Sequence, residues 1–184
     1  MTYYGPKELA ESFRTVRKNT ITIAEEIGEE HYGFRAAPDT RTVAEIMVHI
    51  ALIPRVQEQI HGAERRTTLV GFDFPAFMGK LMAEAEKPRD KQQIVAMLKE
   101  EGERYANWLE GLPDDFLGQQ VAFPPGMTPS SKSRFEMILG VKEHEMHHRA
   151  QLMLMERMIG MVPHLTREFQ ARMAAMQASQ ATAR

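Results

Sequence analysis

Apolar residues recur along most of the chain at intervals of three and four positions, a spacing that places them on one face of an α-helix. The alternation typical of strands is almost absent, so the pattern predicts an all-α protein. Thr42 with Glu45, and Ser133 with Glu136, have the spacing of a capping box and mark two helix starts. Pro54 is expected to bend one helix. We expect four long helices, over residues 6–28, 42–62, 90–112 and 133–159.

The links between these helices predict a four-helix bundle. A short link joins the first two helices, which are therefore expected to be antiparallel neighbours. Residues 62–89 form a much longer link, which can run the length of a bundle and leave the second and third helices parallel. Within this crossover, residues 74–87 are expected to form a short extra helix.

The chain is expected to form one domain, because 184 residues with 43% hydrophobic content can bury a single core. We find no internal repeat and no domain boundary. Residues 164–176 are amphipathic and complete a single domain over residues 1–176. Residues 177–184 are expected to form a flexible C-terminal tail.

Composition excludes several functions. The formal net charge is −2 and there is no long basic run, so nucleic acid is not an expected partner. There is no cysteine, so any metal must be bound by histidine nitrogens or carboxylate oxygens. No apolar run approaches the roughly 20 residues of a membrane span, and the N-terminus does not look like a signal peptide. We therefore expect no membrane association and a cytoplasmic protein.

The fourth predicted helix holds three of the seven histidines: His144, His147 and His148. An α-helix advances by about 100° per residue, so His148 lies about 40° from His144 and both share the apolar side. His147 lies about 60° to the other side, at the edge of that stripe. Two imidazoles one turn apart can chelate one ion, but a lone His-x-x-x-His pair is more often a polar helix edge.

His49 lies at the centre of the apolar face of the second predicted helix. A buried imidazole needs a polar partner, and a lone core histidine usually hydrogen-bonds a backbone or side-chain group. Three inward-facing histidines on two helices can instead satisfy one another by sharing an ion. We therefore predict that His49, His144 and His148 bind a divalent metal.

Two residues beside these histidines are candidates for proton transfer. Glu45 lies one turn before His49, although its capping-box role explains it equally well. His147, at the edge of the stripe, is the second candidate. Glu143 and Glu145 flank His144 and are expected to point away from the core and to be solvated.

The other histidines are weaker candidates. His31 is expected in a loop, and His61 at a helix C-terminus, where a cationic imidazole is favourable. His164 follows Pro163 and is expected outside the bundle core. Arg134 and Arg149 are expected to be ordinary surface or interface residues. Tyr105 and Trp108 are interpreted primarily as core residues and, as a second possibility, as residues that line a pocket.

The segments "TRTVAEIMVHIA", "KEHEMHHRAQL" and "MIGMVP" together resemble the DinB/YfiT-like metalloenzyme superfamily. The resemblance covers nearly the whole chain, including "RDKQQIVAMLKEEGERYANWLEGLPDDFL". The motif on the fourth helix is specific, whereas the one on the second helix alone is not. Ala150 is a departure, because members commonly have glycine there.

The resemblance implies an up-down-down-up four-helix bundle and a homodimer. It also implies that His49, His144 and His148 bind a divalent metal, often zinc or nickel. Characterised relatives include transferases and isomerases that use low-molecular-weight thiols such as bacillithiol or mycothiol.

The leading functional hypothesis is a metal-dependent transferase that adds a small thiol to an electrophilic small-molecule substrate. Three neutral histidines leave open coordination positions, which is typical of catalytic metal sites. Such an ion lowers the pKa of a bound water or thiol. One alternative is a hydrolase that uses metal-bound hydroxide. Another is a non-catalytic, stress-associated binding or dimerisation protein with a structural metal.

Overall fold

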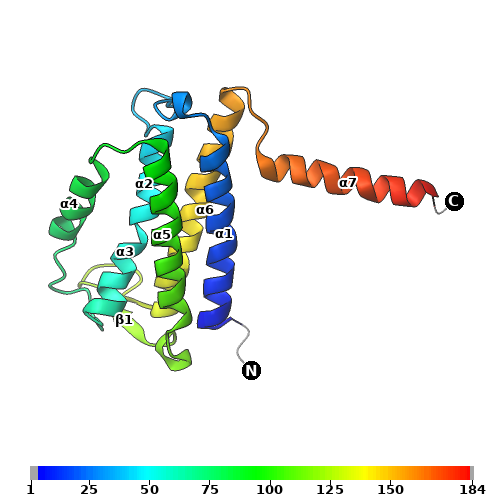
Figure 1. The fold of residues 1–184 in the computed structure, drawn as a ribbon. Coiled ribbons are helices and arrows are strands. Elements are labelled where there is room, and N and C mark those ends of the chain that lie inside the picture. The colour runs from blue at the N-terminus through cyan, green and yellow to red at the C-terminus, as the bar shows by residue number, and fades with distance from the viewer. Residues whose placement is uncertain (1–3, 183–184) are drawn as a thin grey trace.

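The computed structural model describes residues 4–182, and four long helical segments form the body of the molecule (Figure 1). Helices α1 (Pro6–Glu26) and α6 (Arg134–Met158) run in one direction. Helices α2 (Val43–Leu52) and α5 (Lys91–Glu110) run in the opposite direction, which gives the order up-down-down-up. The predicted four-helix bundle is therefore confirmed.

Side-chain caps fix where the bundle helices begin. The hydroxyl of Thr42 accepts a hydrogen bond from the backbone N–H of Glu45 at 3.1 Å, and the Glu45 carboxylate accepts one from the N–H of Thr42 at 2.7 Å. Asp90 and Ser133 cap α5 and α6 in the same reciprocal way. These caps satisfy backbone donors that have no partner within the helix.

The second predicted helix is divided into three parts. Pro54 has no backbone N–H to donate, and α2 ends just before it. A short helix α3 (Pro54–Gln57) follows, and then the π-helical turn Glu58–Ala63. Beyond this turn the crossover forms the expected extra helix, α4 (Phe74–Ala85), which packs beside α2 (Figure 1).

The link between α5 and α6 contains a small hairpin that the sequence pattern did not predict. Strands β1 (Gln120–Ala122) and β2 (Ser131–Ser133) pair antiparallel, with Val121 opposite Lys132. Three residues are too few to show an alternating pattern. Short 3-10 turns cover Glu29–His31 and Asp114–Phe116.

A buried polar layer separates the upper and lower parts of the apolar core. The guanidinium of Arg17 bonds the Glu145 carboxylate at 2.9 Å, and Thr20 Oγ1 donates to the same carboxylate at 2.7 Å. Arg17 and Glu145 are 3% and 1% exposed. The prediction that Glu145 is solvated was wrong, because its partner comes from α1, which is distant in sequence.

Arg17 also bonds the backbone of the two remaining bundle helices. It donates to the carbonyl of Leu98 on α5 at 2.8 Å and to that of Ile50 on α2 at 3.1 Å. Gly102 on α5 makes room for it, since a Cβ there would lie 2.7 Å from Arg17 Cγ. One side chain thus joins all four helices.

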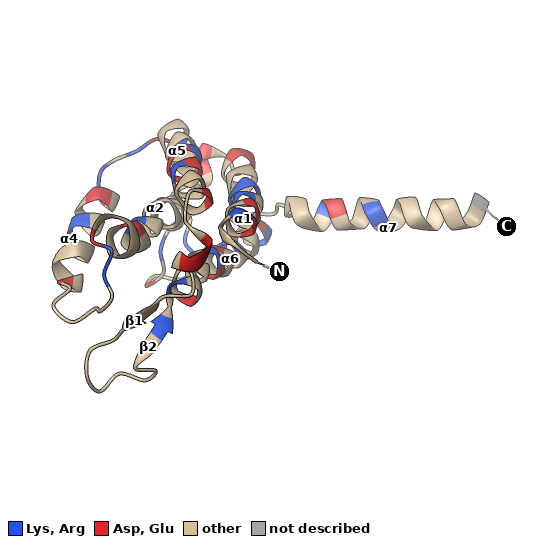
Figure 2. Ribbon diagram, turned by 90° about the horizontal axis from the view of Figure 1, so that it is seen from below, with Lys and Arg blue, Asp and Glu red and all other residues tan. Residues whose placement is uncertain are grey.

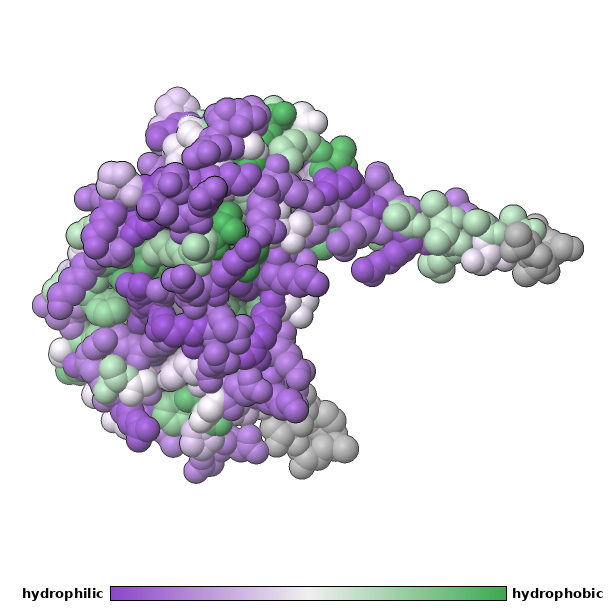
Figure 3. All heavy atoms as spheres, in the orientation of Figure 1, coloured by the Kyte–Doolittle hydropathy of each residue, from purple (hydrophilic) through white to green (hydrophobic). Residues whose placement is uncertain are grey.

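The C-terminal segment is helical beyond the point where a tail was expected. Gly160, at a φ of 85°, follows the end of α6, and α7 (His164–Thr182) begins after Pro163. Residues 177–182 continue α7, whereas residues 183 and 184 lie outside the described range. After its first turn α7 projects from the bundle (Figure 1), and apolar surface is exposed along it (Figure 3). Phe169 and Met176 are among its exposed apolar residues.

The junction of α6 and α7 buries two polar side chains. Neither carboxylate oxygen of Glu156 has a hydrogen-bond partner among the described residues. His164, which was expected outside the core, is also buried, with Nε2 3.4 Å from Oδ1 of Asn19 on α1. Nearby, Arg167 pairs with Glu26 of α1 at 2.5 Å. Burial raises the pKa of Glu156 to about 7, and the nearby Glu26 adds to the effect.

No helix in the described part of the chain is long and apolar enough to cross a membrane.

Replacing Glu145 with alanine is expected to lower the free energy of unfolding by about 3–5 kcal/mol, because Arg17 is then buried without its counter-charge. Urea denaturation measures this change. The double variant Arg17→Met/Glu145→Leu is expected to recover much of the loss. As a control, Arg14→Ala removes the half-exposed pairs with Glu103 and Glu110 and is expected to cost no more than about 1 kcal/mol. Equal losses for the two alanine variants would contradict this account.

Glu156→Gln is expected to change how stability depends on pH. Because the folded pKa of Glu156 is raised above 4.5, its contribution to stability is present below about pH 4.5 and is lost as pH rises through about 7. The variant should match the wild type near pH 4 and exceed it at pH 8 by about 3 kcal/mol. Denaturation curves between pH 4 and pH 8 test this, and parallel pH profiles for the two proteins would rule it out.

Candidate metal centre

The structure brings together the three histidines selected from the sequence. His49 projects from α2, and His144 and His148 project from α6 one turn apart. His144 Nε2 lies 3.2 Å from Nε2 of His49 and 3.2 Å from Nε2 of His148. One ligand atom from each ring lies within 4.8 Å of the others.

The two separations of 3.2 Å fit ligands of a common ion. Nitrogens about 2.0–2.1 Å from a tetrahedral zinc ion lie roughly 3.3 Å from one another. The donor set also fits, because three ring nitrogens that face one another cannot all be satisfied by sharing protons among themselves. A cation at their centre would satisfy all three.

A neighbouring glutamine fixes the tautomer of His148. Its Nδ1 lies 2.7 Å from Oε1 of Gln151, and an amide oxygen can only accept. Nδ1 therefore carries the proton, and the lone pair of Nε2 faces His144. Metal-bound histidines are commonly oriented by such a contact on the ring nitrogen away from the ion.

Burial keeps the imidazoles neutral. It lowers the pKa of His49 to about 3, and the positive charge of Arg41 adds to the effect. It lowers the pKa of His144 to about 4, with a further contribution from His148. The pKa of His148 is also lowered, again chiefly by burial. Neutral imidazoles have the free lone pairs that a metal requires.

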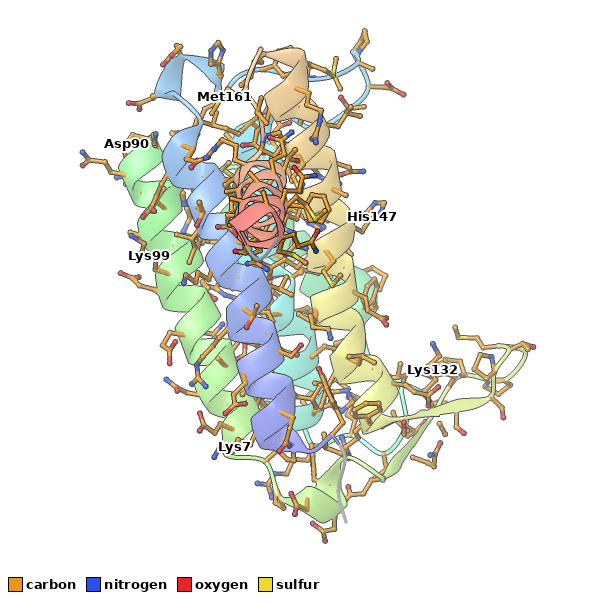
Figure 4. The ribbon with its side chains drawn as sticks, turned by 90° about the vertical axis from the view of Figure 1, so that its right-hand side faces the viewer. Lys7, Asp90, Lys99, Lys132, His147 and Met161 are labelled. Carbon is orange, nitrogen blue, oxygen red and sulfur yellow. The ribbon has the colours of Figure 1, made fainter. Side chains whose placement is uncertain are left out.

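The two proton-transfer candidates occupy different surroundings. Glu45 caps α2, and its carboxylate lies 3.9 Å from Arg35. His147 is exposed on the outer side of α6 (Figure 4), and its Nε2 lies 3.2 Å from Nε2 of Gln151. Since Gln151 Nε2 only donates, His147 accepts this bond and holds Gln151 in place beside His148.

The remaining histidines lie apart from this group. His31 lies in the 3-10 turn after α1. His61 lies in the π-helical turn that ends the second predicted helix, as expected, but burial lowers its pKa to about 4, so the ring is neutral there. Arg134 was expected at the surface but is 1% exposed, and it contacts His61.

A cavity of about 740 Å³ opens beside His49, and we call it the His49 cavity. It lies between α2, α4 and the link that follows α4. Apolar walls come from Leu52 and Leu81, while Arg41 and Glu45 supply charge beside the histidine. A small molecule in this cavity would therefore meet both apolar surface and polar groups near the triad.

Sequence reasoning missed two residues that support the site. Gln151 lies three positions after His148 and four after His147, and this spacing alone indicated possible contact on one helix face. Arg17 had no such local signal, because its partner is 128 positions away.

A sequence model of the DinB superfamily matches residues 12–152, about three quarters of the chain. The chain belongs to the DinB superfamily. No curated protein sequence matches it.

Solved structures share the DinB fold at low sequence identity. YfiT from Bacillus subtilis, described as a probable metal-dependent hydrolase with an unusual four-helix bundle topology, is 15% identical with a TM-score of 0.66. The alignment covers 88% of this chain and 91% of YfiT. A DinB-like protein from Bacillus subtilis is 18% identical with a TM-score of 0.60, over 83% of this chain and 92% of that one. A DinB family member from Exiguobacterium sibiricum is 20% identical with a TM-score of 0.59, over 87% and 94%.

Proposed function

We propose that His49, His144 and His148 bind one divalent metal ion, with zinc or nickel as the expected metal, and that the protein is a metal-dependent enzyme. The main support is that Nε2 of His144 lies 3.2 Å from the Nε2 atoms of both His49 and His148, a separation expected of two ligands of one tetrahedral ion. Three neutral ligands leave the ion its full charge and open positions, so it can acidify a bound water or thiol.

The residues of the His49 cavity would bind and orient the substrate. Arg41 makes no ion pair among the described residues, so its guanidinium is available to a carboxylate of a thiol or substrate. Apolar walls from Leu52 and Leu81 would exclude water. Glu45 lines this cavity, whereas His147 does not, so Glu45 is the better placed of the two proton-transfer candidates.

The specific reaction we propose is transfer of a low-molecular-weight thiol to an electrophilic small molecule. The neutral donor set supports it, since a thiol sulfur is an effective ligand for zinc or nickel and becomes a nucleophile when deprotonated. Hydrolysis is the second candidate, favoured by the description of YfiT as a probable metal-dependent hydrolase. A structural metal in a non-catalytic binding protein is the third.

The homodimer stays a prediction. Leu154 and Met158 on α6, and Phe169 and Met176 on α7, are exposed apolar residues. We expect a second copy to cover exposed apolar residues such as these.

Purified protein is expected to contain roughly one equivalent of zinc or nickel, because the triad provides three ligands for one ion. Elemental analysis of the wild type, His49→Ala and His148→Ala tests this, with His147→Ala as a matched histidine control. Both triad variants should lose the metal, and the control should keep it. A wild-type protein that contains no metal after dialysis against zinc and nickel would contradict the proposal.

The same proteins separate the three candidate functions. A thiol transferase should couple small thiols to 1-chloro-2,4-dinitrobenzene, and a hydrolase should cleave p-nitrophenyl esters without a thiol. In either case the triad variants should lose turnover yet remain folded on their apolar core. If the metal is structural, the variants should melt far below the wild type, with no turnover to lose.

Gln151→Leu is expected to weaken metal binding by roughly 10–100-fold, because His148 loses the acceptor that orients its ring. Competition with a chromophoric chelator measures the change. Gln151→Glu preserves an acceptor and should remain close to wild type. Unchanged affinity in Gln151→Leu would show that this contact does not support the site.

A further inference from the structure

A second cavity of about 790 Å³ lies at the lower end of the bundle, well away from the histidine triad. It is bounded by the π-helical turn Glu58–Ala63, the end of α5 and the 3-10 turn Asp114–Phe116, and we call it the π-turn cavity. Figure 2 views this end of the bundle from below. His61 is about three helical turns beyond His49, or roughly 18 Å along the helix path. No triad residue lines this cavity.

The backbone at this cavity is irregular in two ways. The N–H of Glu64 bonds the carbonyl of Gln59 at 2.9 Å, the five-residue spacing of a π-turn, which often occurs at functional sites. Arg65 follows with a φ of 46°, a left-handed conformation that a non-glycine residue rarely adopts. Gly62 brings the turn close to Trp108, since a Cβ there would lie 3.0 Å from the indole nitrogen.

The wall behind the cavity holds a buried guanidinium without a carboxylate partner. Among the described residues, Arg134 bonds Oε1 of Gln119 at 3.1 Å and Nδ1 of His61 at 2.8 Å, and it lies over the ring of Phe116. All three partners are neutral. A buried charge is costly unless a counter-charge is nearby, and the adjacent Arg65 adds a second positive charge.

His61 presents an unused donor. Arginine can only donate, so Nδ1 of His61 accepts from Arg134 and the proton of the neutral ring lies on Nε2. This Nε2 is buried and has no hydrogen-bond partner within residues 4–182. Burial and Arg134 lower the pKa of His61 to about 4, so the ring stays neutral at pH 7.

The acidic residues that line the cavity do not supply a counter-charge to Arg134 among the described residues. Glu58 is paired with Arg104 at 2.6 Å. Asp115 is exposed on the 3-10 turn and makes no ion pair among the described residues. Arg65 is also exposed and makes no ion pair or hydrogen bond in this part of the chain, so its guanidinium is free to bind a ligand.

We propose that the π-turn cavity binds a small organic anion. Its negative group would lie against the exposed guanidinium of Arg65, and the buried ring of His61 and the charge of Arg134 would lie behind the cavity wall. Its apolar body would lie against Trp108 and Phe116, which line the cavity. Mostly apolar walls with a few convergent donors are typical of small-molecule sites. The site is independent of the metal centre.

Trp108 is the one tryptophan in the sequence, so its fluorescence reports on this cavity. Benzoate is expected to change that fluorescence saturably and to raise the melting temperature. Benzyl alcohol, which has a similar body without the charge, should bind at least roughly tenfold more weakly. Displacement of benzoate by inorganic phosphate would support the anion site and show that it accepts phosphate as well as carboxylate groups. The absence of a saturable change with either anion would overturn the proposal.

The variants use Arg65 because it is exposed and its replacement should leave the protein folded. Arg65→Gly removes the side chain while permitting the left-handed backbone, and it should weaken benzoate binding roughly tenfold. Arg65→Lys should retain most of the affinity. The control Arg172→Ala removes the same charge from α7 and should change nothing. Equal binding by Arg65→Gly, or loss of binding in His49→Ala, would refute this site.

Discussion

The arrangement of this bundle depends on the buried guanidinium of Arg17. It joins Glu145 on α6 to the backbone of Ile50 on α2 and Leu98 on α5. Ile50 follows His49, and Glu145 follows His144, so the contact fixes the two helices that carry the triad at the level where their histidines meet. Apolar packing alone tolerates small shifts, whereas charge-assisted hydrogen bonds are directional. The polar layer therefore sets the register in which three imidazoles converge.

Local signals made the helices predictable from the sequence. Thr42, Asp90 and Ser133 fix helix starts through contacts within a few residues, and Pro54 ends α2 because it lacks an N–H. Helical periodicity also placed His49 and the pair on α6 toward the core, and the structure brings those rings together. The helix ends depend on contacts within a few residues, and the convergence of the histidines required only that each of them face the core.

The errors concern charged residues whose partners are distant in sequence. Helical periodicity predicts the direction of a side chain but not its partner. Glu145 was therefore assigned to solvent, although it pairs with Arg17 on α1. Arg134 was assigned to the surface for the same reason, since it is buried against His61, which comes from a different helical segment. The helical state of residues 177–182 has no clear marker in the sequence. Their alanines are compatible with a helix, but there is no apolar stripe to indicate packing.

The two buried arginines differ in a way that separates structure from recognition. Arg17 has a carboxylate and two carbonyls, so its charge is balanced within the fold and stabilises it. Arg134 is buried as deeply but has only an amide oxygen, a neutral imidazole and an aromatic ring. The fold places the Glu145 carboxylate against Arg17 but no carboxylate against Arg134, which lies behind the π-turn cavity. This contrast supports the proposal that a bound anion balances the charge of Arg134 at the lower end of the bundle.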